Sequence, residues 1–179
     1  MFQMIHRRVI NNCQHYFYLF SLTEVCKMAK TKEKTNPVTE TLNTQVANFS
    51  VLYMKLHHYH WYVKGESFFT LHLKFEELYK EMASHFDTIA ERMLSLGASP
   101  TATFKEQLQL ASIKEASGDE DTQEMVKALA KDFDTICTEL TEGITIAEDK
   151  DDQPTADLFI AIRTSLEKHR WMLEAYLAD

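Results

Sequence analysis

The sequence predicts an all-α protein built as a four-helix bundle. Gly and Pro are scarce, with four and three residues in a chain of 179. Leu, Glu, Lys, Ala and Met, which favour helices, are common instead. Four long segments also repeat apolar residues every three to four positions, which is the pattern of amphipathic helices. Four such helices in a chain of this length pack around one core.

The first two helices are delimited by proline and glycine. The first begins after Pro37 and ends at Gly65, because glycine readily adopts the left-handed conformation of a C-terminal cap. Its apolar positions are Leu42, Val46, Phe49, Tyr53, Leu56 and Val63. The second has the most regular period and ends at Gly97. Its apolar positions are Leu71, Phe75, Leu78, Met82, Phe86, Ile89, Met93 and Leu96.

The third and fourth helices are separated by the acidic break EDKDDQP. The third begins near Asp121, with apolar residues at Val126, Leu129, Phe133, Ile136, Leu140 and Ile144. The fourth carries Leu158, Ile162, Leu166, His169, Leu173 and Tyr176. The connection between the second and third helices, about residues 97–120, is much longer than the other two and contains a candidate short helix near 104–113. One long crossover is the ferritin-like arrangement of a four-helix bundle.

Composition excludes several classes of protein. The formal net charge of −8 argues against a fold whose surface coats nucleic acid. No run of about 18 apolar residues is present, so no membrane span is expected. The three cysteines are odd in number and lack CxxC spacing, which disfavours a disulfide framework and favours the reducing cytoplasm.

The N-terminal segment differs in composition from the rest. Residues 1–27 lack a regular amphipathic period, and their apolar run is short with no cleavage site of the signal-peptide type. We expect that these residues are a leader upstream of a true start at Met28, since residues 24–25 can be encoded by a purine-rich string resembling a ribosome-binding site. Residues 28–37 are then a flexible, lysine-bearing tail. The bundle is expected over residues 38–179.

The second predicted helix carries two pairs of candidate metal ligands. His72 and Glu76 are four residues apart, as are Asp87 and Glu91. At about 100° per residue these four side chains form one stripe, directed about 135° away from the apolar stripe of the same helix. They therefore point away from the bundle core. No Glu is followed by His three residues later, so a di-iron site inside the bundle lacks its usual motif.

Each of these residues has an ordinary structural explanation when taken alone. Acidic residues on a polar helix face are usually solvated, and His72 alone is most simply a surface residue. His60 falls on the apolar stripe of the first helix, where a hydrogen-bonded core histidine is the default. Neither pair of ligands is convincing in isolation.

The spacing of the two pairs favours a site shared between two chains. Glu76 and Asp87 are about 16 Å apart along the helix axis, so one metal centre cannot use both from one chain. Two copies of the helix packed antiparallel across a two-fold axis would bring His72 and Glu76 of one to Asp87 and Glu91 of the other. Near the axis, Ala83 is small enough for close approach and Lys80 could compensate the carboxylates.

His60 could supply a further nitrogen ligand to each shared site. The resulting set of His60, His72, Glu76, Asp87 and Glu91 mixes imidazole and carboxylate groups. Such ligands suit Fe(II), Mn(II) or Zn(II) better than soft metals. A neighbouring Trp61 and an iron with open positions suggest redox chemistry.

Several motifs resemble one family. HWYVKGESFFTLH, then FEELY and DTIAERMLSLG, and EKHRWML near the C-terminus are similar to the Dps family, the DNA-binding proteins from starved cells or mini-ferritins. The resemblance covers about residues 38–179. It implies a hollow homododecamer with ferroxidase sites at the dimer two-folds, which oxidises Fe(II), preferably with hydrogen peroxide, and stores ferric mineral. Consuming both reagents would protect DNA from hydroxyl radicals.

The resemblance also assigns site residues. It gives His60, His72 and Glu76 to one subunit, and Asp87 and Glu91 to its partner. His57, one turn before His60, resembles an auxiliary ligand or a residue that supports the ligands. Glu76 departs from the form of the pattern that has Asp, and its extra methylene changes the reach of the carboxylate.

Two further groups carry expectations about iron entry and DNA. The acidic residues around the break before the fourth helix are candidates for an iron-entry pore, although a solvated loop explains them equally well. They are Glu148, Asp152 and Asp157. The basic tail residues could bind DNA without sequence preference, against the repulsion of an acidic body. They are Lys30, Lys32 and Lys34.

Two other functions compete with the ferroxidase hypothesis. The first is a structural nucleoid protein that compacts DNA through the tail, with the metal site mainly assembling the shell. The second is a bundle in which the histidines are only structural. The occupying metal, the oxidant used in the cell and the iron capacity are not fixed by the sequence.

Overall fold

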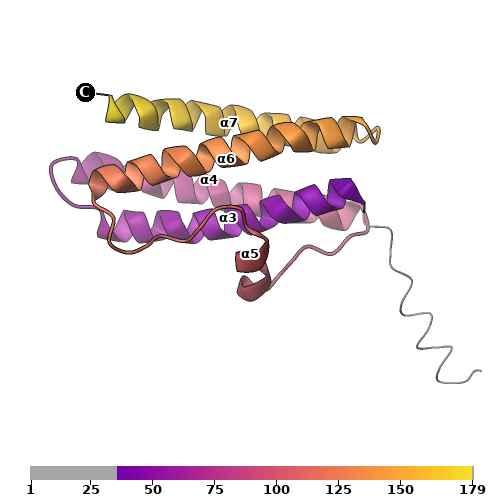
Figure 1. The fold of residues 1–179 in the computed structure, drawn as a ribbon, viewed down its shortest axis with the longest axis horizontal. Coiled ribbons are helices and arrows are strands. Elements are labelled where there is room, and N and C mark those ends of the chain that lie inside the picture. Colours follow the sequence, from indigo (N-terminus) through magenta and orange to yellow (C-terminus); the bar gives the residue numbers. More distant parts are fainter. Residues whose placement is uncertain (1–35, 179) are drawn as a thin grey trace, which may run out of the picture. The chain divides into compact units, whose positions relative to one another are not determined.

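A computed structural model describes residues 36–178, and every regular element within that range is a helix (Figure 1). The elements are α3 Pro37–Tyr62, α4 Phe68–Ser95, α5 Phe104–Leu110, α6 Thr122–Glu148 and α7 Gln153–Leu177. The four long helices and the short helix in the crossover confirm the predicted fold class. The predicted leader, residues 1–27, and residues 28–35 of the predicted tail lie outside the described residues.

The helix ends follow from local capping residues. Asn36 caps α3, and its Oδ1 accepts a hydrogen bond of 3.0 Å from the Val38 N–H. Asp121 caps α6 in a capping box with Glu124. After α4, Gly97 has a φ of +76°, which is a left-handed conformation that favours glycine. The boundaries expected at Pro37, Asp121 and Gly97 agree with these ends.

The helices pack as two pairs (Figure 1). Short turns join α3 to α4 and α6 to α7, so the members of each pair are antiparallel neighbours. The crossover between the pairs carries α5, which packs against α3. Gly143 on α6 permits close packing, because a Cβ there would lie 2.7 Å from side-chain atoms of both Phe159 and Thr41.

One hydrophobic core joins all four long helices. Its largest fully buried side chains come from each of them. They are Tyr59, Phe49, Phe75, Phe133, Phe159, Leu42, Leu52, Leu56, Leu78, Met82, Ile89 and Leu129. Three predicted apolar positions, Tyr53, Leu96 and Tyr176, are instead exposed, and Tyr53 and Tyr176 each line a surface groove.

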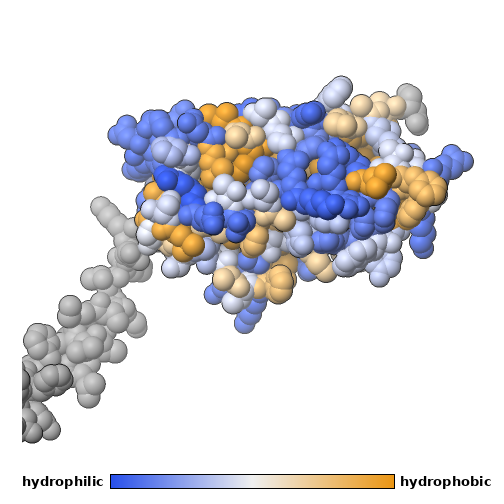
Figure 2. Space-filling view, turned by 180° about the vertical axis from the view of Figure 1, so that it is seen from behind, coloured by the Kyte–Doolittle hydropathy of each residue, from blue (hydrophilic) through white to orange (hydrophobic). Residues whose placement is uncertain are grey.

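The surface of the bundle is mixed in character. Seen from behind, hydrophilic residues cover much of it, and hydrophobic residues gather in a few patches (Figure 2). Among the described helices, none combines the length and the apolar character that crossing a membrane requires.

Candidate metal centre

His60 and His72 meet where α3 turns into α4. Their rings stack with centroids 3.7 Å apart and planes 20° from parallel. His60 Nδ1 lies 2.7 Å from the His72 carbonyl oxygen, and His72 Nδ1 lies 2.8 Å from the His60 carbonyl oxygen. The His60 carbonyl is available because it belongs to the last turn of α3, where carbonyls lack intrahelical partners.

These reciprocal hydrogen bonds determine which ring nitrogen of each histidine carries the proton. A carbonyl oxygen only accepts hydrogen bonds, so Nδ1 of both rings must donate. In each neutral imidazole the lone pair is then on Nε2, the atom left for a metal ion. A histidine ligand that donates its other N–H to a backbone carbonyl is the usual arrangement at metal sites. The geometry of His60 and His72 therefore fits a metal-binding role.

Glu76 lies one turn of α4 after His72 and forms an ion pair with Lys80. The hydrogen bond and the charge of Lys80 lower the pKa of the Glu76 carboxyl below its ordinary value, and the two histidines add to this effect. The carboxylate is therefore ionised at neutral pH and ready to accept a cation.

Asp87 and Glu91 continue the same stripe and are exposed. Asp87 lies about 16 Å beyond Glu76 along α4. Within residues 36–178, no three histidine, cysteine or carboxylate side chains converge closely enough to hold a metal ion. One chain therefore does not bring the predicted ligands together: Asp87 and Glu91 lie far along α4, and His60, His72 and Glu76 do not themselves form a three-ligand site.

His57 lies beside this region, with its ring stacked on Tyr79 at 3.9 Å between centroids and 5.2 Å from the ring of Trp61. Burial lowers the pKa of His57, and the charge of His60 lowers it further. Its Nδ1 is buried without a hydrogen-bond partner among the described residues. The suggestion that His57 assists the ligands stays a prediction.

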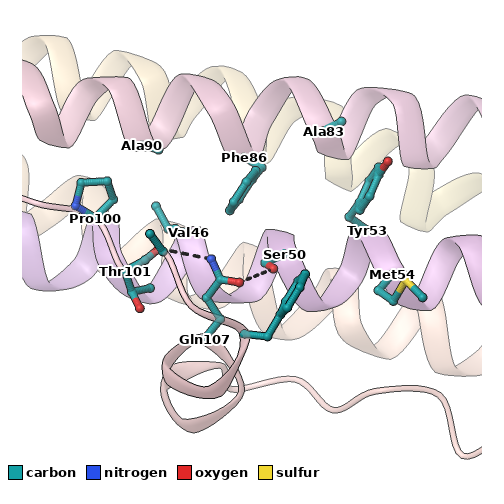
Figure 3. Close-up of a pocket in the computed structure, with 12 residues that line it drawn as sticks. Val46, Ser50, Tyr53, Met54, Ala83, Phe86, Ala90, Pro100, Thr101 and Gln107 are labelled. Atoms are coloured by element: carbon teal, nitrogen blue, oxygen red, sulfur yellow. Dashed lines mark hydrogen bonds between the residues drawn. The ribbon is translucent and has the colours of Figure 1, made fainter.

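An apolar groove of about 560 Å³ adjoins the ligand stripe (Figure 3). It is lined by α3, α4 and the crossover, and Figure 3 shows Ala83, Phe86 and Ala90 of α4 facing Val46 and Tyr53 of α3. The Gln107 side chain closes one side through hydrogen bonds to the Ser50 hydroxyl and the Thr101 carbonyl. The face of α4 that carries the ligands is therefore flanked by apolar surface that nothing in the described chain covers.

Comparison with known proteins identifies the family. A family model for the ferritin-like domain matches residues 39–179. The DNA protection during starvation protein 2 of Bacillus anthracis is 55% identical over 140 residues, spanning 78% of this chain and 96% of that protein. The chain belongs to the Dps family. The resemblance carried by the HWYVKGESFFTLH segment is thereby confirmed.

Solved Dps structures have the same fold. A Dps protein of Bacillus brevis is 54% identical, with a TM-score of 0.78 over 79% of this chain and 95% of that one. The Dps of Listeria innocua, soaked with zinc, is 39% identical, with a TM-score of 0.77 over 79% of this chain and 97% of that one.

This Dps chain also contains a polar cluster that the sequence did not indicate, between α4 and α7. His169 Nε2 lies 2.7 Å from Glu81 Oε2, and the Ser165 hydroxyl donates to the other oxygen of the same carboxylate. His85 Nε2 lies 3.2 Å from Glu81 Oε1. His169 is buried, with 5% of its surface exposed. A histidine on the apolar stripe of the last helix was the available signal, because a buried imidazole requires a partner.

The charges of this cluster are set by burial and hydrogen bonding. Burial acts to raise the pKa of Glu81, but the bonds from Ser165 and His169 outweigh it, so the pKa lies below its ordinary value. Burial lowers the pKa of His85. Glu81 is therefore an ionised carboxylate that joins α4 to α7.

The three pore candidates occupy different environments. Glu148 and Asp157 are exposed on α6 and α7. Asp152 caps α7 and accepts a hydrogen bond of 2.6 Å from Arg92 and one of 2.7 Å from the Thr155 hydroxyl. Its oxygens are thus engaged in joining α4 to the turn before α7. The pore remains a prediction.

Proposed function

We propose that the chain is the subunit of a homododecameric mini-ferritin. It oxidises Fe(II), preferably with hydrogen peroxide, at dinuclear sites shared across a dimer two-fold, and stores ferric mineral inside the shell. The observation that carries the proposal is the reciprocal hydrogen bonding of His60 and His72. It leaves both Nε2 lone pairs for a metal ion, with Glu76 one helical turn after His72 and the other carboxylates of the stripe about 16 Å or more beyond Glu76.

The register of the ligands on α4 supports the two-fold arrangement. The midpoint between Glu76 and Asp87 and the midpoint between His72 and Glu91 coincide, between residues 81 and 82. One two-fold axis at that point therefore places Glu76 of one copy opposite Asp87 of the other, and His72 opposite Glu91. The apolar groove beside the stripe supplies the surface on which a second copy of the chain packs.

The ligand set supports iron as the substrate. Imidazole and carboxylate ligands suit Fe(II), and Zn(II) or Mn(II) can occupy the same groups. The soaking of the Listeria innocua relative with zinc is consistent with such a site. Two Fe(II) ions supply the two electrons that, with two protons, reduce one hydrogen peroxide to two waters. Removing both reagents suppresses hydroxyl radicals, which agrees with the DNA protection named in the relatives.

The cellular setting is part of the proposal. We place the protein in the cytoplasm, where Fe(II) and DNA occur together. Direct binding to DNA would depend on the tail residues Lys30, Lys32 and Lys34, which lie outside the described residues. The alternative of a nucleoid protein that compacts DNA depends on that tail, whereas the ferroxidase proposal depends on described geometry.

The test is iron oxidation in a histidine double variant. Fe(II) and then hydrogen peroxide are added anaerobically, and ferric absorbance is followed in wild type, in His60→Ala/His72→Ala and in His58→Ala. His58 lies on the same helix and serves as the matched control. We expect the double variant to oxidise iron about 100-fold more slowly or worse, and His58→Ala to match wild type.

Two results would count against the proposal. Equal rates in wild type and the double variant would defeat it. The second result is a double variant that no longer assembles but whose subunits still oxidise iron at the wild-type rate. It would indicate that the metal has a structural role.

A further inference from the structure

Lys80 lies on the same stripe of α4 as the proposed ligands. It is eight residues after His72, which at about 100° per residue places it within the sector that the ligands span. Its ammonium forms an ion pair with Glu76 Oε1, one helical turn away. The only other Lys–Glu pair within α4, between Lys74 and Glu77, lies on a different face of the helix, where Lys74 also contacts His169 of α7.

The proposed two-fold register places Lys80 in the middle of the interface. Lys80 and Ala83 are equally far from the axis, so Lys80 of one copy faces Ala83 of the other. In the same register Asp87 of the second copy lies opposite Glu76. The Lys80 backbone is thus about 6 Å along the helix from both carboxylates, within reach of its side chain.

The shared site carries an excess of negative charge when no metal is bound. Glu76 of one copy and Asp87 and Glu91 of the other supply three carboxylates to each site, and their mutual repulsion opposes dimer formation. An ammonium within reach of two of them reduces that repulsion. A metal ion that takes the same Glu76 oxygen must displace it.

We propose that Lys80 is a built-in counter-ion, which occupies Glu76 in the metal-free dimer and is displaced when Fe(II) binds. This inference rests on the proposed shared site. Lys80 is a positioning residue and takes no part in the redox step. Its charge stabilises the metal-free assembly and weakens the binding of the first metal ion. Removing that charge should therefore destabilise the metal-free assembly and raise the affinity for metal. An ion pair that only supports the helix would not produce such a shift.

The experiment compares Lys80→Met and Lys80→Arg with wild type and with Lys168→Met. Lys168 is exposed on α7, so Lys168→Met makes the same change in net charge away from the stripe. Metal is removed from the full-length assembled proteins, and Zn²⁺ affinity is measured by competition with a chromophoric chelator. Assembly of the metal-free proteins is measured by analytical ultracentrifugation on dilution.

We expect Lys80→Met to bind Zn²⁺ about five- to ten-fold more tightly than wild type, from the loss of one charge near the site. Metal-free Lys80→Met should dissociate at a several-fold higher protein concentration, while Lys80→Arg and Lys168→Met match wild type. The role of Lys80 would be overturned if Lys80→Met bound Zn²⁺ no more tightly than Lys168→Met does. It would also be overturned if metal-free Lys80→Met assembled as wild type does.

A histidine variant separates this failure from failure of the site itself. If His60→Ala/His72→Ala loses Zn²⁺ binding and Lys80→Met does not differ from wild type, the shared site stands and the counter-ion role falls. If the histidine variant binds Zn²⁺ as wild type does, both proposals fall.

Discussion

Two polar faces of α4 differ in where their partners are. On the face toward α7, Glu81 accepts hydrogen bonds from Ser165 and His169, and Arg92 bonds to Asp152 and Thr155. On the opposite face, the carboxylates of the ligand stripe have only a local partner or none within the described chain: Glu76 meets Lys80, and Asp87 and Glu91 are exposed.

The difference separates polar residues that support the fold from those that we propose bind metal. A buried carboxylate or imidazole is costly unless it is paired, and the α7 side of α4 satisfies that requirement within one chain. The ligand stripe and its apolar groove do not. The face that lacks such partners in its own chain is the one that we propose a second copy and a metal ion complete.

The largest effect on stability is expected at Glu81. Glu81→Ala leaves the buried His169 and Ser165 without their acceptor, which should lower the free energy of unfolding by about 2 kcal/mol. Thermal denaturation should show a Tm lower by about 6 °C. Iron oxidation by the folded variant should stay close to the wild-type rate, because Glu81 does not belong to the ligand stripe.

Glu77→Ala is the matched control for this variant. Glu77 is exposed on the same helix and pairs only with Lys74. If Glu81→Ala were as stable as Glu77→Ala, or if it lost iron oxidation while folded, the division of α4 into a structural and a functional face would be wrong.

A smaller, pH-dependent effect is expected at Asp152. Burial acts to raise its pKa, but bonds from Thr155 and Arg92 outweigh it and hold the pKa below the ordinary value of 3.8. A carboxyl with a depressed folded-state pKa adds stability above its unfolded pKa, and that stability is lost as the pH falls through the folded value. Asp152→Asn keeps a residue that caps helices well but removes the charge that faces Arg92.

Urea unfolding at a series of pH values measures this effect. At pH 7 we expect Asp152→Asn to be less stable than wild type by about 1 kcal/mol. The difference should shrink as the pH falls below 3.8, since wild-type Asp152 then becomes protonated. A difference that stays constant down to pH 2 would show that the charge of Asp152 contributes nothing.

Local signals made most of the fold predictable. Pro37 and Gly97 mark helix ends by their own backbone preferences, and the apolar period identifies each core face. The short helix ends at Leu110, earlier than the predicted 113. The reason is a long-range contact, since the Ser112 N–H donates to Asn48 Oδ1 of α3 at 2.8 Å and holds the chain there.

The candidate site could be proposed from the sequence where spacing on one helix suggested it. The stripe on α4 and its two-fold register follow from residue numbers alone. The reciprocal hydrogen bonds between His60 and His72 depend on the turn between two helices. The pair of Glu81 and His169 joins residues 88 apart. The place of His169 on the apolar stripe signals that it needs a partner, but no local signal in the sequence says that the partner is Glu81.

Complementation between two inactive variants tests the shared site most directly. One variant carries His60→Ala/His72→Ala, and the other carries Asp87→Ala/Glu91→Ala. In a mixed dimer, one of the two sites receives both intact groups of ligands. Co-expression with random pairing should therefore restore about a quarter of the wild-type rate of iron oxidation. A co-expressed mixture as inactive as either variant alone would contradict a site built from two chains.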